Sequence, residues 1–160
     1  MNILKFFHII HNVYFKQKHF IKRKYYSSEG EDLFLKKKLN LKKNGFYVDV
    51  GAYHPIRKSN TMILYQNGWR GINIDANQFS IDLFNFVRPH DVNFNLAISD
   101  KSEKINFYSS KEHDPQSTAS KSFLKYDYID KNRKYNKKKI EARTLNYVLK
   151  NSKYNGQKID

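Results

Sequence analysis

Short apolar runs alternate with helical patterns in the middle of the chain. Residues 46–50 and 71–75 are rich in aromatic and β-branched side chains and predict two strands, and residues 92–98 predict a third. Between these runs, apolar positions three and four residues apart predict one helix that begins after residues 59–61 and a second that begins at Asn77. Strands that alternate with single helices are typical of parallel sheets, so we expect an α/β domain with a doubly wound sheet.

The pattern is weaker after the third strand. Residues 104–108 and 140–143 predict two further strands, and residues 144–149 predict a short helix. The intervening residues 109–138 are polar and rich in lysine, and we expect them to form a long mobile loop. Residues 157–160 resemble the entry into another buried strand, so we expect the sheet to be incomplete at the carboxyl-terminal end of this sequence.

Residues 1–26 differ in character from the residues that follow. Their apolar positions are interrupted by Lys5, His8 and His11, and no small-residue cleavage site follows, so a signal peptide is not expected. Two interpretations stay open: a basic amphipathic helix that makes peripheral contact with a membrane, or a helix that packs on the main fold or on a partner subunit. We therefore divide the chain into a basic, aromatic-rich arm, residues 1–26, and one partial domain, residues 27–160.

Length and composition limit the alternatives. A chain of 160 residues is long enough for one domain with a modest core. It has no cysteine, which excludes disulfides and thiolate metal sites. No apolar stretch reaches the roughly 18 residues that a membrane-spanning helix needs, and we expect a cytoplasmic protein.

The formal net charge of +15 raises a second possible function. Such an excess favours nucleic acids, anionic membranes or acidic polymers as partners. The lysine runs, however, fall between apolar segments, as scattered surface charge does, and no nucleic-acid-binding motif is visible. A basic binding module for RNA or an acidic polymer is therefore the alternative function, and no specific nucleic-acid partner is expected.

Acidic residues end two neighbouring predicted strands. Asp49 lies near the end of the first strand and is followed at once by Gly51, where the backbone can turn tightly and approach a ligand. Asp75 ends the second strand, at a distance after the glycine that suits an acid accepting from two ribose hydroxyls. Alternatively, Asp49 and Asp75 cap the helices that follow them. At the end of the third strand, Ala97 and Ile98 are candidates to pack against an adenine.

The loop after the first strand narrows the choice of cofactor. A dinucleotide fold needs G-x-G-x-x-G to bring a pyrophosphate onto a helix N-terminus, whereas here the run Ala52-Tyr53-His54-Pro55 follows Gly51. Large side chains and a proline leave little room for a pyrophosphate, which disfavours a nicotinamide-dependent oxidoreductase. A nucleoside cofactor without phosphate fits better, and S-adenosylmethionine is such a cofactor.

Several runs then resemble a known family. They occur in order at residues 26–33, 45–55, 59–61, 68–77 and 95–100. Together they are similar to FkbM-type methyltransferases. The resemblance covers about residues 25–160 and leaves out the N-terminal arm.

The resemblance implies a Rossmann-like, class I methyltransferase sheet that binds S-adenosylmethionine. It implies methylation of a hydroxyl oxygen on a sugar, polysaccharide or natural product, so a small molecule or glycan is the expected acceptor; bacterial relatives are associated with surface polysaccharide synthesis. Asp49 and Gly51, with Ala52 beside them, match the first cofactor motif, and Asp75 matches the ribose-binding acid. The residues that open the helix facing the methionine moiety are Ser59, Asn60 and Thr61.

Two expectations concern chemistry that the resemblance does not settle. His54 is the only histidine in the cofactor loop and is a candidate general base, although packing against Pro55 or contact with the methionine carboxylate accounts for it as well. No cluster of metal ligands is visible, and we expect no metal in this segment. The family continues past a position like Asp160 into a strand carrying Asp-x-Glu-Gly, so we expect this sequence to be a truncated copy or a piece of a longer one.

Overall fold

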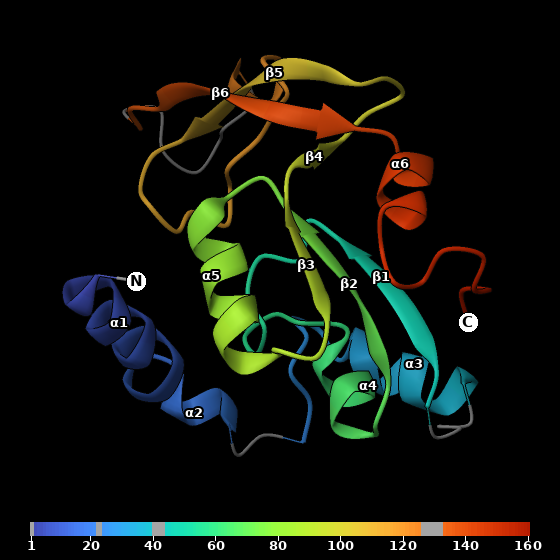
Figure 1. The fold of residues 1–160 in the computed structure, drawn as a ribbon. Helices are drawn as coiled ribbons and strands as arrows, with labels where there is room; N and C mark the ends of the chain where they lie inside the picture. The colour runs from blue at the N-terminus through green and yellow to red at the C-terminus, as the bar shows by residue number, and fades with distance from the viewer. Residues whose placement is uncertain (1, 22–23, 40–43, 126–132) are drawn as a thin grey trace.

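The core of the protein is a parallel sheet of three strands. The structure, a computed structural model, describes residues 2–21, 24–39, 44–125 and 133–160. The sheet has the order β1-β2-β3, with strands β1 (Phe46–Val50), β2 (Arg70–Asp75) and β3 (Val92–Asn95). The strands are connected by helices α4 (Met62–Gln66) and α5 (Gln78–Val87), as Figure 1 shows. The predicted α/β arrangement with parallel strands is confirmed.

Alternating side chains of the strands supply two separate cores. Phe46 on β1 packs with Ile72 and Ile74 of β2 on one face, which Val148 of helix α6 (Leu145–Lys150) covers. On the opposite face, Tyr47 packs against helix α4. Both faces of the sheet are therefore covered, which is the layer arrangement that α/β domains adopt to bury a parallel sheet.

The third predicted strand is divided. Only Val92–Asn95 pairs with β2, and the chain bends at Leu96, whose side chain is buried in the core. Strand β4 (Ala97–Ile98) then pairs in parallel with β6 (Asn136–Arg143) in a second sheet of order β4-β6-β5. The prediction of one strand over residues 92–98 is corrected, because an unbroken apolar run cannot show where a strand changes partner.

The predicted long loop is shorter than expected. Strand β5 (Glu103–Ser109) pairs with β6 in antiparallel register from Glu103↔Ala142 to Ser109↔Asn136. Residues 136–138 therefore belong to a strand, contrary to the prediction. Their lysines masked it, because exposed positions on a two-stranded ribbon need no apolar alternation; the ammonium of Lys138 lies 5.2 Å from the ring centre of Phe107.

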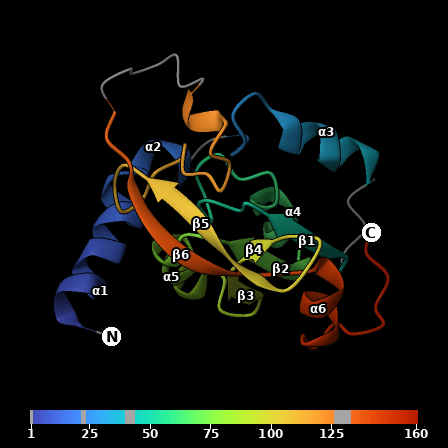
Figure 2. The ribbon, with the colours of Figure 1, turned by 90° about the horizontal axis from the view of Figure 1, so that it is seen from above.

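The N-terminal residues pack on the fold through one face. They form α1 (Ile3–Ile10), the π-helical turn η1 (His11–Phe15) and α2 (Lys18–Ile21), beside α5 in Figures 1 and 2. Ile9 and Val13 are buried in one cluster with Phe79 and Leu83 of α5. Of the two open interpretations of the arm, packing on the main fold is thus realised by this face.

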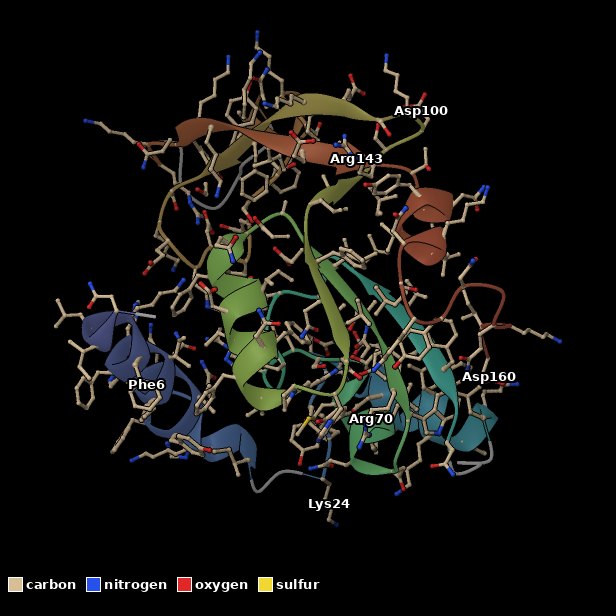
Figure 3. The ribbon with its side chains drawn as sticks, in the orientation of Figure 1. Phe6, Lys24, Arg70, Asp100, Arg143 and Asp160 are labelled. Carbon is tan, nitrogen blue, oxygen red and sulfur yellow. The ribbon has the colours of Figure 1, made fainter. Side chains whose placement is uncertain are left out.

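The ends of the domain agree in part with the predictions. Helix α3 (Glu31–Lys38) precedes the sheet, and the buried carboxylate of Asp32 accepts from the Ser27 hydroxyl at 2.6 Å. Residues 157–160 form no strand, but the Asp160 N–H donates to the Phe46 carbonyl of β1 at 3.1 Å (Figure 3). None of the helices in the described ranges is long and apolar enough to cross a membrane.

Candidate functional site

A cavity of about 310 Å³ lies where the two sheets meet. One wall comes from the carboxyl ends of β1 and β2, and the other comes from the second sheet, which lies above these ends in Figure 1. Residues 114, 115 and 117–119, between β5 and β6, add to the lining. Open α/β sheets bind their ligands at this edge, so the cavity is the candidate functional site.

Gly51 opens the cavity at the end of β1. Its φ of +73° is in the left-handed region that favours glycine, and a Cβ at this position would meet nothing within 4 Å. The N–H groups of Gly51 and Ala52 both donate to the Ile74 carbonyl, at 2.9 and 3.1 Å. Gly51 thus lines the cavity as predicted, whereas the Ala52 side chain is buried and does not line it.

Asp75 lines the cavity with a carboxylate that is held in place by backbone groups. Its Oδ2 accepts from the Tyr53 N–H at 2.8 Å and its Oδ1 accepts from the Asn77 N–H at 2.7 Å. Burial raises the pKa of Asp75 above its usual value, and these two N–H groups oppose the shift. A carboxylate has about four acceptor sites, so these two N–H groups leave others for hydroxyl donors, among them the neighbouring Ser80 hydroxyl.

The helix after Asp75 is capped by Asn77 and not by Asp75 itself. The Asn77 side chain caps α5 by accepting from the Phe79 N–H at 2.9 Å. Asp75 therefore does not cap α5, and its carboxylate lines the cavity.

Much of the cavity lining is apolar. Ala97 and Ile98 line the cavity as predicted, together with Leu96, Phe107 and Pro115. The cavity therefore combines acidic and hydroxyl side chains, among them Asp75 and Asp114, with apolar ones.

Residues 114–119 were missed by the sequence analysis. The buried carboxylate of Asp114 accepts from the N–H and hydroxyl of Ser110 at 2.8 and 2.9 Å and forms an ion pair with Arg133. Burial raises the pKa of Asp114, but these hydrogen bonds and the Arg133 charge outweigh it, and the net shift is downward. The Asp114-Pro115 pair is a turn signal, but nothing local indicated that the turn would cover a cavity.

Asp49, Ser59 and Thr61 come together beneath the cavity and do not line it. The Thr61 hydroxyl donates to Asp49 Oδ2 at 2.7 Å. Arg88, which is fully buried, donates to the hydroxyls of Ser59 and Thr61, each at 2.8 Å, and to the Pro55 carbonyl. These side chains hold the loop that carries Gly51.

Asn60 and Asp49 differ in their surroundings. Asn60, between the two buried hydroxyl residues, is exposed. Burial raises the pKa of Asp49, and the Thr61 hydrogen bond and the Arg88 charge oppose the shift.

Arg88 was missed because an arginine at a helix end, just before a proline, has the same pattern as a surface residue.

His54 is fully buried, and both of its ring nitrogens are in hydrogen bonds. Nδ1 accepts from the N–H groups of Ile56 and Arg57, each at 3.0 Å, and Nε2 lies 3.1 Å from Asn12 Oδ1. Since Nδ1 accepts twice, the proton is on Nε2 and points at Asn12. No nitrogen is left for a substrate hydroxyl, so the candidate role as general base is corrected to one of holding the loop.

A half-buried histidine that the sequence did not single out, His113, packs against Tyr53, which lines the cavity. The His113 ring stacks on Tyr53 with centroids 4.4 Å apart, and its Nε2 lies 3.1 Å from the Tyr53 carbonyl. Burial lowers the pKa of His113 to about 4 and holds that of His54 well below 6.5. Both rings are therefore neutral in the native state at neutral pH.

These neutral histidines predict that acid destabilises the protein. Between about pH 4 and 6.5 the unfolded chain binds protons that the native histidines do not bind, so the free energy of unfolding falls as the pH falls through this window. For His113 alone, the loss between about pH 7.5 and 5.5 is about 1 kcal/mol, and His113→Gln removes it. Urea unfolding of both proteins at the two pH values measures the difference; equal losses would contradict the prediction.

No three His, Asp or Glu side chains of the described residues lie close enough together to hold a metal ion.

Comparison with curated proteins and with solved structures found no match. The model of the methyltransferase FkbM domain matches residues 49–160, which confirms the resemblance over that range and leaves the motifs at residues 26–33 and 45–48 outside it. Since this match spans more than half of the chain, the protein belongs to the FkbM family of S-adenosylmethionine-dependent methyltransferases.

Proposed function

We propose that the cavity between the two sheets binds S-adenosylmethionine and that the protein methylates a hydroxyl oxygen of a sugar, polysaccharide or natural product. The observation that carries the proposal is the Asp75 carboxylate, which lines the cavity and has acceptor sites beyond those used by the Tyr53 and Asn77 N–H groups. The cofactor's ribose would donate its hydroxyls there, and its adenine would lie against Ala97, Ile98 and Phe107.

The loop after β1 supports a cofactor without a pyrophosphate. Tyr53 occupies the position of a phosphate-binding glycine; its N–H donates to Asp75 and its ring stacks on His113. These contacts use the loop backbone that would otherwise cradle a phosphate. A nucleoside with a sulfonium side chain needs no such cradle.

The chain contributes positioning and exclusion of water. When bound, S-adenosylmethionine would supply an electrophilic methyl group to a hydroxyl oxygen. Asp75 would fix the ribose, the apolar walls would keep water from the base, and Arg88 would hold the loop through Ser59 and Thr61. Such positioning contributes several kcal/mol to a transfer between two bound reactants.

Transfer of a labelled methyl group tests the proposal. We expect label from [methyl-³H]-S-adenosylmethionine to enter a glycan in a form that survives mild alkali, as a methyl ether does and a methyl ester does not. Asp75→Ala abolishes the transfer, and Asp100→Ala, at an exposed turn (Figure 3), leaves it unchanged. Salt-dependent binding of RNA without any methyl transfer would favour the basic binding module instead.

A further inference from the structure

The N-terminal helices have a second face that the domain does not cover. Ile3, Phe7, His11 and Phe15 follow one another at intervals of four residues, so they lie on one side of the helical segment. Ile3, Phe7 and Phe15, together with Leu4, keep more than half of their surface exposed. Exposed apolar stripes of this kind are rare on soluble surfaces and mark sites of interaction.

This stripe lies opposite the buried face of the same helices. Ile9 and Val13 point into the core, and the Asn12 amide oxygen meets His54. Figures 1 and 2 show α1 at the outer edge of the molecule from two directions, and Figure 3 shows side chains extending from its outer side. The stripe therefore forms a ridge on a helix whose position is fixed from behind.

The charged residues of the N-terminal segment itself are all basic, although Asp82 and Glu112 of the domain lie against its inner side. The first acidic residue of the chain is Glu29, whereas six lysines and arginines precede it. Lys16 and Lys18 are exposed beside the stripe, and Lys5 pairs with Asp82 of α5 at 2.6 Å. A ridge of Phe, Ile and Leu flanked by lysines matches the surface of an anionic bilayer, where rings enter the headgroup boundary and ammonium groups meet lipid phosphates.

We propose that this ridge docks the protein onto anionic membrane surfaces. Residues 2–21 lie on the bilayer through Ile3, Leu4, Phe7 and Phe15, with Lys16 and Lys18 at the headgroups. Asn12 connects the ridge to His54, whose Nδ1 accepts from the backbone of the cofactor loop. Docking thus holds the cavity beside the membrane, and the docking itself does not depend on methyl transfer.

Co-sedimentation of the full chain with vesicles tests the proposal. We expect binding to phosphatidylcholine vesicles that contain about 30% phosphatidylglycerol and at least about tenfold weaker binding to phosphatidylcholine alone. Raising the salt from about 0.1 M to about 0.5 M weakens the binding, since screening reduces the lysine contribution.

Matched variants distinguish binding through the ridge from nonspecific adsorption to the vesicles. Phe7→Ser with Phe15→Ser lowers vesicle binding by about tenfold or more, because the variant lacks the two phenylalanine rings that the bilayer buries. Phe34→Ser removes an equally exposed phenylalanine from α3 and leaves binding unchanged. Lys16→Glu with Lys18→Glu lowers binding, while Lys137→Glu with Lys139→Glu, the same change of charge on β6, does not.

Three results would overturn the proposal. They are the absence of binding to anionic vesicles, equal binding by the Phe7/Phe15 double variant, and equal binding to neutral vesicles. Sedimentation velocity tests whether a second copy of the chain covers the ridge instead. If the native chain forms a dimer that the double variant does not form, and the native chain does not bind vesicles, then the ridge is a contact between copies. That result would contradict membrane docking.

Discussion

Replacing Asp75 by alanine is expected to weaken binding of S-adenosylhomocysteine by about 100-fold or more. Two hydrogen bonds from ribose hydroxyls to a carboxylate contribute about 1.5 kcal/mol or more each, and both are lost together. The N–H groups of Tyr53 and Asn77 also lose their acceptor, so the loop after β1 is less firmly held. Isothermal titration of the ligand into the native and variant proteins measures the loss.

The control for this prediction is an aspartate outside the cavity. Asp100 is exposed and accepts from the Ser99 hydroxyl, and it does not line the cavity. Asp100→Ala therefore binds the ligand as tightly as the native protein. Circular dichroism confirms that the Asp75 variant is folded, and a folded Asp75→Ala protein with native affinity would contradict the ribose assignment.

Replacing Arg88 by methionine is expected to lower the free energy of unfolding by about 3–5 kcal/mol, because several buried acceptors lose a charged donor. The guanidinium is fully buried and donates to Tyr47, Ser59, Thr61 and the Pro55 carbonyl. Without it, these acceptors stay buried with fewer donors. Urea unfolding followed by circular dichroism measures the change.

Arg143 supplies the comparison for Arg88. It pairs with Glu141 at 2.6 Å near the surface of the second sheet, and such pairs contribute up to about 1 kcal/mol. Arg143→Met should therefore cost no more than about 1 kcal/mol. If the two arginine variants were destabilised equally, the buried network would not be what holds the loop.

The parallel strands with their connecting helices and part of the cavity could be predicted because they depend on local pattern. Gly51, Asp75, Ala97 and Ile98 each lie at or just after the carboxyl end of a strand, and parallel topology brings these ends to one edge. Apolar periodicity and one glycine were enough to place them. The sequence therefore predicted part of the polar lining and part of the apolar lining of the cavity.

The remaining lining depends on contacts between distant segments. Phe107 reaches the cavity because β5 pairs with β6, and Pro115 reaches it because Asp114 binds Ser110 and Arg133. Neither pairing has a periodic signal, since the lysines of β6 are exposed. Nothing in the local sequence indicates such contacts before the second sheet has formed.

His54 shows a different limit of the sequence. A histidine in a loop after a strand has the same pattern whether it serves as a base or accepts from its neighbours' N–H groups. The burial of His54 and its hydrogen bonds decide between these two roles. One of its partners, Asn12, lies 42 positions earlier in the chain. For the same reason, the arm could not be recognised as support for the cofactor loop.

Calorimetric titration of S-adenosylhomocysteine into the native chain tests the central claim most directly, because it asks whether the cavity is a nucleoside site without assuming an acceptor. We predict binding at one site, with a dissociation constant of about micromolar order, and no heat from a nicotinamide dinucleotide at the same concentration. Absence of binding by the folded chain, or equal binding of the dinucleotide, would contradict the assignment of the cavity.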